Sequence, residues 1–172
     1  PDPRTRAARL FGRLLLAELD AATLDELRAP AIATALAEIG IELPAPEALD
    51  TVAAEYFEHV LHPRGQAPLV QSLWHGGSYE GEAAVAVRRV AAAAGVELGP
   101  GARGAPPDHA GCLLVLWAEL RERNAVIAND FATVHLGWLP AAIARSRATG
   151  FYAAVLAAIG GLCADLTAGA NG

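Results

Sequence analysis

Apolar residues recur every three or four positions along most of this 172-residue chain, which is the spacing of one face of an α-helix. Leu10 and Leu14 follow this spacing near the start of the chain, and the arginines of the same segment fall on the opposite face. The pattern predicts an amphipathic helix over about 3–19. Thr23, with Glu26 three residues later, has the spacing of a capping box and predicts that a short helix follows.

Further helices are predicted downstream, each bounded by glycine or proline. We expect one helix to end near Pro30, a second to end at Gly40, a third to span about 46–61 and a fourth to begin at Gly81. Beyond these, one helix carries the apolar stripe from Leu113 to Leu120, the next restarts at Pro140, and the last ends near Gly169. Alanine and leucine, both strong helix formers, supply most of the apolar residues, and no run alternates as a strand does. The chain is therefore predicted to be all-α, a single orthogonal bundle of about eight helices.

The segment GVELGPGARGAPP is the clearest candidate for a linker, because it is rich in glycine and proline. It divides the chain into an N-terminal lobe of residues 1–98, a hinge of residues 99–109 and a C-terminal lobe of residues 110–172. A flexible hinge also permits two chains to exchange lobes, so a homodimer is compatible with the sequence.

The formal net charge of −6 narrows the choice of partners. An acidic surface repels nucleic-acid phosphates and anionic membranes, and it attracts basic peptides. All 13 basic residues are arginines, which excludes Schiff-base chemistry and the lysine of a phosphate-binding loop. We therefore expect a cationic peptide, and not a nucleic acid, as the partner.

No membrane insertion is expected from the sequence. The longest uncharged stretch, Ala148 to Ala164, is shorter than the roughly 20 residues that a transmembrane helix needs, so it is interpreted as a core helix. Arg13 and Glu18 interrupt the apolar residues near the N-terminus, which favours an amphipathic helix over a secretory signal. Two cysteines without metal-binding spacing suit the reducing cytoplasm.

Few residues are arranged for catalysis. Glu55, His59 and His62 can share one helix face and hold a metal ion, but the spacing is not that of a known zinc motif. No serine lies in a nucleophile elbow, and the glycine-rich linker lacks the residues of a phosphate loop. A small metal-dependent helical enzyme remains an alternative, while surface or capping histidines explain the same residues.

Two features favour peptide binding. The first is a group of aromatic residues in and before an irregular segment: Tyr56, Phe57, Trp74 and Tyr79. Aromatic side chains beside an irregular loop are typical of a peptide groove, although packing in the core accounts for any one of them equally well.

The second feature is the sequence Pro107-Asp108-His109, directly before an apolar helix. An aspartate in the first turn is stabilised by the helix dipole, and proline is favoured where a helix begins, so a structural role is sufficient. An acidic residue and a histidine between two lobes are also suited to contact an arginine of a ligand.

Several of these segments occur in a fixed order. Pro68, Ser72 and Trp74 precede a helix that begins at Gly81, and Pro106 to His109 open the next apolar helix. Further along, the segment FATVHLGWLP places Phe131 four residues before His135 and ends in Trp138 and Pro140. In this order the segments resemble those of the TorD/DmsD/NarJ-type chaperones, which are maturation factors of molybdenum-containing redox enzymes. Ala105 stands where that family's hinge has a glutamate.

The resemblance implies an all-helical cytoplasmic chaperone without catalytic activity or cofactor. Its expected partner is the catalytic subunit of a molybdenum-containing oxidoreductase, whose twin-arginine signal peptide it binds until the molybdenum cofactor has been inserted. The residues expected to bind the peptide are Asp108, His109, Pro107, Trp74, Ser72, Tyr56, Phe57 and Tyr79. A second alternative is a NarJ-like assembly factor that acts on the apoenzyme independently of the signal peptide.

Overall fold

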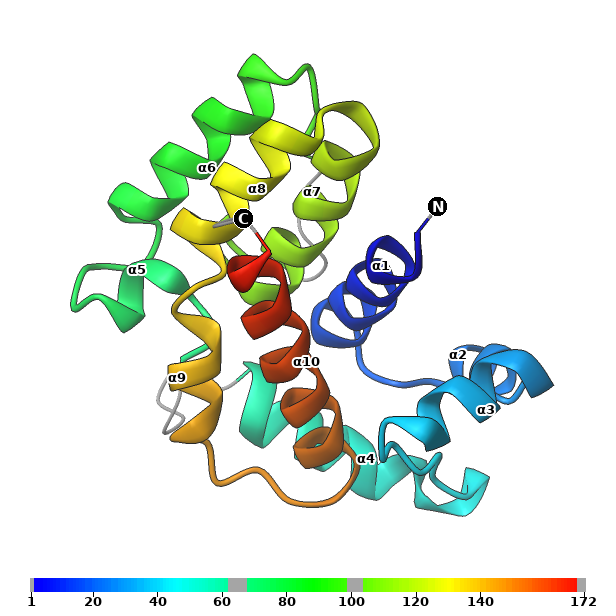
Figure 1. Ribbon diagram of the computed structural model, residues 1–172. Coiled ribbons are helices and arrows are strands. Elements are labelled where there is room, and N and C mark those ends of the chain that lie inside the picture. Colours follow the sequence, from blue (N-terminus) through cyan, green and yellow to red (C-terminus); the bar gives the residue numbers. More distant parts are fainter. Residues whose placement is uncertain (1, 62–67, 99–103, 170–172) are drawn as a thin grey trace.

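The computed structural model describes residues 2–61, 68–98 and 104–169, and within these ranges it is helical without a β-strand. The helices are α1 (Pro3–Leu16), α2 (Ala21–Leu27), α3 (Pro30–Glu38), the 3-10 turn η1 (Pro46–Ala48), α4 (Leu49–Tyr56), the π-helical turn η2 (Phe57–Leu61), α5 (Gln71–Trp74), α6 (Glu82–Ala93), α7 (Ala110–Arg123), α8 (Ala125–His135), α9 (Leu139–Ala144) and α10 (Gly150–Ala168). The predicted all-α fold is therefore confirmed (Figure 1).

Capping residues explain where several helices begin. The side chain of Asp2 accepts a 2.9 Å hydrogen bond from the Thr5 N–H at the start of α1. Asp20 caps α2 by accepting a 2.7 Å hydrogen bond from the N–H of Thr23. The predicted cap at Thr23 is wrong, because Asp20 offers its carboxylate three residues earlier and Thr23 becomes the donor.

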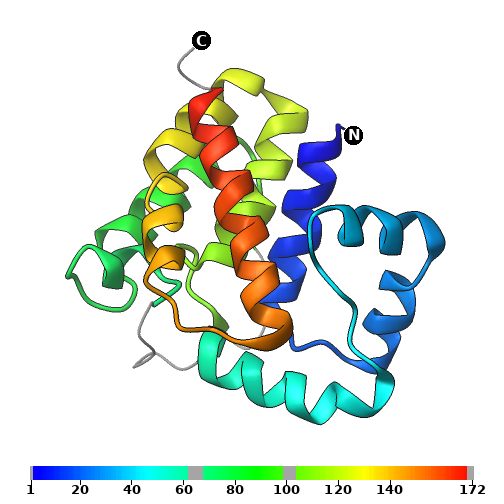
Figure 2. The ribbon, with the colours of Figure 1, turned by 60° about the horizontal axis from the view of Figure 1, so that its bottom comes forward.

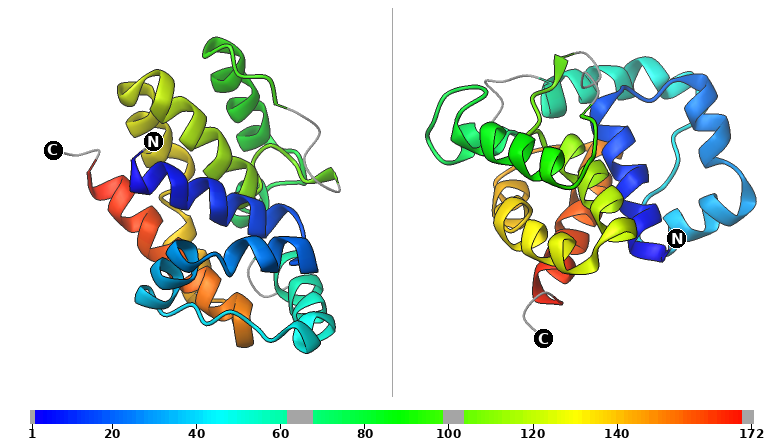
Figure 3. Two further views of the ribbon diagram at one scale, coloured as in Figure 1. Left: turned by 90° about the vertical axis from the view of Figure 1, so that its right-hand side faces the viewer. Right: turned by 90° about the horizontal axis from the view of Figure 1, so that it is seen from above.

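Helix α1 crosses α7 at close range where a glycine of each helix meets the other. A Cβ atom on Gly111 would lie 2.8 Å from Leu16 Cγ and 3.0 Å from the carbonyl oxygen of Gly12. A Cβ atom on Gly12 would lie 2.6 Å from Val115 Cγ2 and 2.9 Å from the Gly111 carbonyl oxygen. Only glycine allows this approach without a shift of the helices. Figure 3 shows α1 lying along α7 in both views.

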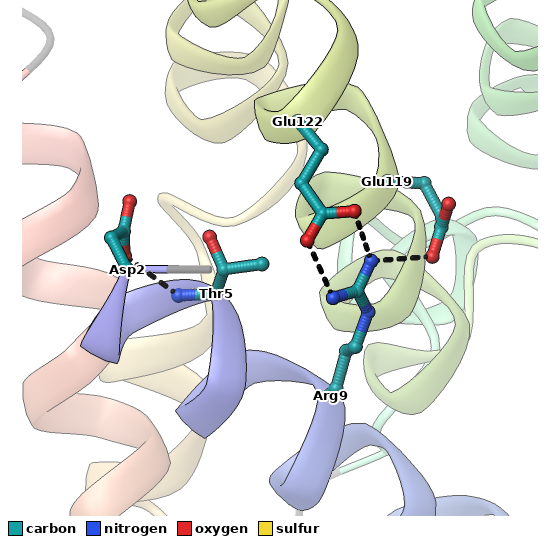
Figure 4. Close-up of polar contacts among 5 residues, drawn as sticks. All are labelled: Asp2, Thr5, Arg9, Glu119 and Glu122. Atoms are coloured by element: carbon teal, nitrogen blue, oxygen red, sulfur yellow. Dashed lines mark hydrogen bonds and ion pairs between the residues drawn. The ribbon is translucent and has the colours of Figure 1, made fainter.

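Ion pairs add to this contact. The guanidinium of Arg9 on α1 forms a bidentate pair with Glu122 on α7, with both N···O distances at 2.7 Å, and a further 2.9 Å contact with Glu119 (Figure 4). These hydrogen bonds raise the pKa of Arg9 and lower that of Glu122. The side chains are about one third exposed or more, so we expect a contribution of about 1 kcal/mol or less.

Helix α10 lies at the centre of the bundle and packs against α1, α4, α8 and α9 (Figure 2). By length and composition it could cross a membrane, and in the structure 44% of its apolar window is buried. The buried face includes Tyr152, Val155 and Ile159, none of which is exposed. The interpretation as a core helix agrees with this packing.

The division into lobes stays a prediction. Residues 99–103 of the proposed hinge lie outside the described residues. Helix α1, assigned to the N-terminal lobe, contacts α7 and α10 of the C-terminal lobe, and a shared set of apolar side chains forms the core. Helices α2 and α3 lie on the outer side of α1, away from α6 to α9 (Figure 1).

Candidate functional site

The chain before α5 pairs with the chain before α7. Val70 and His109 form an isolated antiparallel bridge. The N–H of Gln71 donates to the carbonyl of Asp108 at 3.0 Å, and the N–H of Ala110 donates to the carbonyl of Leu69 at 2.8 Å. Two of the segments on which the family resemblance rests are therefore hydrogen-bonded to each other through their backbones.

A buried carboxylate completes this junction. Asp108 has no exposed surface, and its Oδ2 accepts a 2.8 Å hydrogen bond from the N–H of Ser72. Asp108 Oδ1 and Ser72 Oγ are both buried without a hydrogen-bond partner among the described residues. Among the residues that the structure describes, no arginine or histidine lies within ion-pair distance of Asp108. The described residues therefore leave one oxygen of this buried carboxyl group without a hydrogen-bond or ion-pair partner.

The expected placement of Asp108 in the first turn of a helix is wrong. Helix α7 begins at Ala110, and His109 is its N-cap: its Nδ1 accepts a 3.2 Å hydrogen bond from the N–H of Gly111. The histidine takes the capping position, so the Asp108 carboxylate turns to α5 instead. The carboxylate is fully buried there.

His109 is neutral at ordinary pH. Burial lowers the pKa of its imidazole to about 4, and the negative charge of Asp108 opposes this effect only in part. Because Nδ1 accepts a hydrogen bond, the proton of the neutral ring is on Nε2. His109 lines a cavity of about 140 Å³ together with Tyr56, Tyr79 and Ala105. Ala105, the residue that replaces the family's hinge glutamate, thus faces the same space as His109.

Gln71 joins a third segment to the junction. Its Nε2 donates to the carbonyl of Val134 at 3.0 Å, and its Oε1 lies 2.9 Å from Nδ1 of His135, which donates to it. Burial lowers the pKa of His135, while the charge of Asp108 acts in the opposite direction. The buried Gln71 was not predicted as a site residue, although a glutamine inside the apolar run LVQSLW is a signal that a buried polar contact exists.

Trp74 is covered by two other side chains. Its ring centroid lies 6.1 Å from that of Trp138, whose Nε1 donates a 2.8 Å hydrogen bond to the carbonyl of His135. The guanidinium of Arg145 also lies over the ring of Trp74, 5.4 Å from the ring centroid. Trp74 is half-buried in this stack.

The remaining residues expected to bind a peptide are spread over the surface and the core. Tyr56 is buried, with its ring against Tyr152 and its hydroxyl donating to the carbonyl of Leu15. Phe57 and Tyr79 are more than half exposed, and Pro107 is half-buried. The structure brings Tyr56 and Tyr79 to the cavity beside His109, and it keeps them apart from the groove that Ser72 lines.

An open groove of about 700 Å³ lies over α5, between the start of α6 and the end of α8. Its lining consists of Gln71, Ser72, His75, Gly77, Ser78, Gly81, Glu82, Ala83, Ala86, Val134 and His135. Most of these side chains are small or apolar, and Val134 at its edge is 62% exposed. Asp108 is hydrogen-bonded to the N–H of Ser72, so its carboxyl group is one residue away from the groove.

The residues considered as alternative metal ligands are not seen to form a metal site among the described residues. His62 lies outside the described residues. The Glu55 carboxylate instead lies at the start of α10, where Oε2 accepts a 3.4 Å hydrogen bond from the N–H of Tyr152. Within the described ranges, no three His, Cys, Asp or Glu side chains are grouped to hold a metal ion.

The chain matches a known protein family. A family model described as "Nitrate reductase delta subunit" matches residues 17–143. The match includes α5, the junction at Asp108 and the segment of His135. A comparison with curated proteins gives no matching relative. Since the family model covers well over half of the sequence, the chain belongs to the nitrate reductase delta subunit family, whose members are chaperones of molybdoenzyme assembly.

Proposed function

We propose that this protein is a cytoplasmic chaperone that binds the twin-arginine signal peptide of a molybdenum-containing oxidoreductase. It holds the apo-form of the catalytic subunit until the molybdenum cofactor has been inserted. It performs no catalysis of its own. The family match supports the kind of partner, and the chemistry of the groove over α5 supports the peptide.

The observation that carries this proposal is the uncompensated carboxylate of Asp108. A buried charge is costly unless a hydrogen-bond donor or an opposite charge compensates it. Asp108 Oδ1 and the neighbouring Ser72 Oγ are two acceptors without a partner among the described residues, immediately behind the groove. A guanidinium group supplies several N–H donors and a positive charge, so it fits this requirement.

The shape of the groove suits the rest of such a peptide. Gly77, Gly81, Ala83 and Ala86 leave room for a peptide backbone to approach closely, and Val134 offers an exposed apolar contact. A signal peptide of this type continues from its two arginines into an apolar stretch, which needs a surface of this kind. The net charge of −6 favours the approach of the cationic end.

The site that we propose includes Asp108, Ser72 and Trp74. The guanidinium of Arg145 lies over the ring of Trp74, which supports the proposal that this ring can contact a guanidinium of the peptide.

His109 caps α7 and pairs with Val70, so it holds the start of α7 against the chain before α5. Pro107 lies in the turn that is closed by the hydrogen bond from the His109 N–H to the Pro106 carbonyl. Tyr56 and Tyr79 line the neighbouring cavity, where we assign them to support of the junction or to contact with the client beyond its arginines. Phe57 does not line that cavity, and its exposed ring is assigned to contact with the client.

Co-purification with the client tests the proposal. The client to use is a molybdoenzyme catalytic subunit of the same organism that carries a twin-arginine signal peptide, expressed without molybdenum cofactor. We expect the full-length apo-subunit to co-purify and a subunit without its signal peptide to be lost. Failure of both forms to co-purify contradicts the chaperone function.

The family description favours one second candidate, a delta-subunit-type factor that acts on the apoenzyme independently of the signal peptide. In that case, the full-length and the signal-deleted subunits co-purify equally well. The same experiment therefore separates the two modes of action.

A further inference from the structure

A small polar cavity lies where the side chain of Arg4 at the start of α1 reaches the end of α10. Figure 2 shows these two helix ends at the end of the bundle opposite α4. Its volume is about 80 Å³, and its lining residues are Arg4, Trp117, Arg121, Asn129, Leu166 and Gly169. They come from α1, α7, α8 and α10 with its C-cap. A space of this size holds about two or three water molecules, or one small ion.

Trp117 contributes a hydrogen-bond donor without a partner. The side chain is 2% exposed, and its Nε1 has no hydrogen-bond acceptor among the described residues. Buried indole N–H groups are normally paired, since an unpaired donor loses the hydrogen bond that water would have made. An acceptor in the cavity would satisfy this donor.

Two guanidinium groups lie at the same cavity. Nη1 of Arg4 lies 3.9 Å from the position that a Cβ atom on Gly169 would take, so Arg4 extends from α1 to the end of α10. No ion pair of Arg4 falls within the described ranges. Nε of Arg121 is 3.6 Å from Oδ2 of Asp2. The other carboxylate oxygen of Asp2 caps α1 by accepting the hydrogen bond from the Thr5 N–H (Figure 4).

The charge at the cavity is positive. The two arginines contribute two positive charges, and Asp2 offsets one of them. The end of α10 adds only the partial negative charge of its last carbonyl groups. Indole, guanidinium and amide N–H groups are the donors that bind oxyanions in proteins.

We propose that this cavity is a binding site for one small oxyanion, of the size and charge of inorganic phosphate. The Trp117 Nε1–H donates to one oxygen, and the guanidinium groups of Arg4 and Arg121 neutralise the charge. Asn129 donates through its side-chain amide. The cavity shares α8 with the groove over α5 but none of its lining residues, so the site does not depend on the proposed peptide binding.

Calorimetric titration with inorganic phosphate, in a buffer without other oxyanions, tests this proposal. We expect saturable binding of one phosphate per chain to the wild type. Trp117→Phe keeps an aromatic ring and removes the donor, and Arg4→Gln removes one charge at an exposed position. Each variant should bind about tenfold more weakly, which corresponds to the loss of one hydrogen bond to a charged group.

Arg6→Gln is the matched control, because Arg6 is an exposed arginine of the same helix that does not line the cavity. It should bind phosphate as the wild type does. An NMR titration gives a second readout: the indole N–H signal that is missing in Trp117→Phe should move when phosphate is added to the wild type. Acetate, titrated in parallel, shows whether a carboxylate is preferred over a tetrahedral ion.

Two results would overturn the proposal. One is the absence of saturable phosphate binding to the wild type, whether or not acetate binds. The other is binding that Arg6→Gln weakens as much as Arg4→Gln while Trp117→Phe leaves it unchanged, since that pattern indicates a general attraction to positive charge.

Discussion

The backbone N–H of Ser72 and the carboxylate of Asp108, 36 residues apart in sequence, are joined by a buried 2.8 Å hydrogen bond. This bond ties α5 to the start of α7 and leaves the second carboxylate oxygen without a partner among the described residues. The same residue thus has one oxygen with a structural partner and one that the proposed function assigns to the ligand. Substitutions at Asp108 should separate these two roles.

The structural role predicts different effects for two substitutions of Asp108. Asp108→Asn keeps a carbonyl oxygen for the Ser72 N–H, and we expect the free energy of unfolding to change by less than about 1 kcal/mol. Asp108→Ala leaves that N–H without its acceptor and should cost about 1–3 kcal/mol. Urea unfolding measures both values. Equal destabilisation by the two variants would show that the second oxygen also has a structural partner.

Because α1 and α7 cross at close range, we predict that one methyl group added at Gly111 lowers the stability of the protein. Gly111→Ala places a Cβ atom 3.0 Å from a backbone carbonyl oxygen of α1, so the helices must move apart, at a cost of about 1–3 kcal/mol. Gly161→Ala on α10 is the control, because a Cβ atom there has no neighbour within 4 Å. Alanine favours a helix over glycine, so Gly161→Ala should stabilise the protein by up to about 1 kcal/mol. Thermal unfolding measures the stability of both variants. A Gly111→Ala protein as stable as the wild type would contradict the close packing of α1 and α7.

Because burial lowers the pKa of His109, we predict that the protein loses stability in mild acid. Its pKa is about 4 in the folded protein and 6.5 in an unfolded chain, so between these values the unfolded state binds more protons. Stability is full above pH 6.5 and falls as the pH drops towards 4, by roughly 3 kcal/mol for this group. The lowered pKa of His135 acts in the same direction.

His109→Asn should reduce this pH dependence, since asparagine also caps helices but does not titrate. The measurement is urea unfolding at several pH values between 4.5 and 7. His75→Asn, at an exposed position, should retain the slope of the wild type. An unchanged slope in His109→Asn would mean that the imidazole is not kept neutral by burial.

Most of the helices could be predicted because apolar spacing and bounding prolines and glycines are local signals. Pro140 lies in the first turn of α9, so the predicted restart of the helix is confirmed. Helix α5 could not be predicted, because four residues between glycine- and proline-rich segments are too few for a periodic pattern. The first helix ends at Leu16 and not at 19, since Ala17 already has an extended backbone.

The site was predictable as a set of motifs but not as an arrangement. The order of the segments around Ser72, Asp108 and His135 is visible in the sequence, and the structure joins them through Gln71 and the Asp108 carboxylate. Burial of Asp108 depends on pairing with a segment 36 residues away, which no local pattern indicates. Arg145 on Trp74 and the unpaired Trp117 N–H are likewise products of the packing.

The most direct test of the account is a calorimetric titration with a synthetic peptide in which two consecutive arginines precede an apolar stretch. We predict saturable 1:1 binding to the wild type. Binding should be at least about tenfold weaker for Asp108→Asn, for Trp74→Ala, and for a peptide with both arginines replaced by glutamine, because each change removes a contact of a guanidinium group. Peptide affinity equal to that of the wild type in both Asp108→Asn and Trp74→Ala would contradict the account.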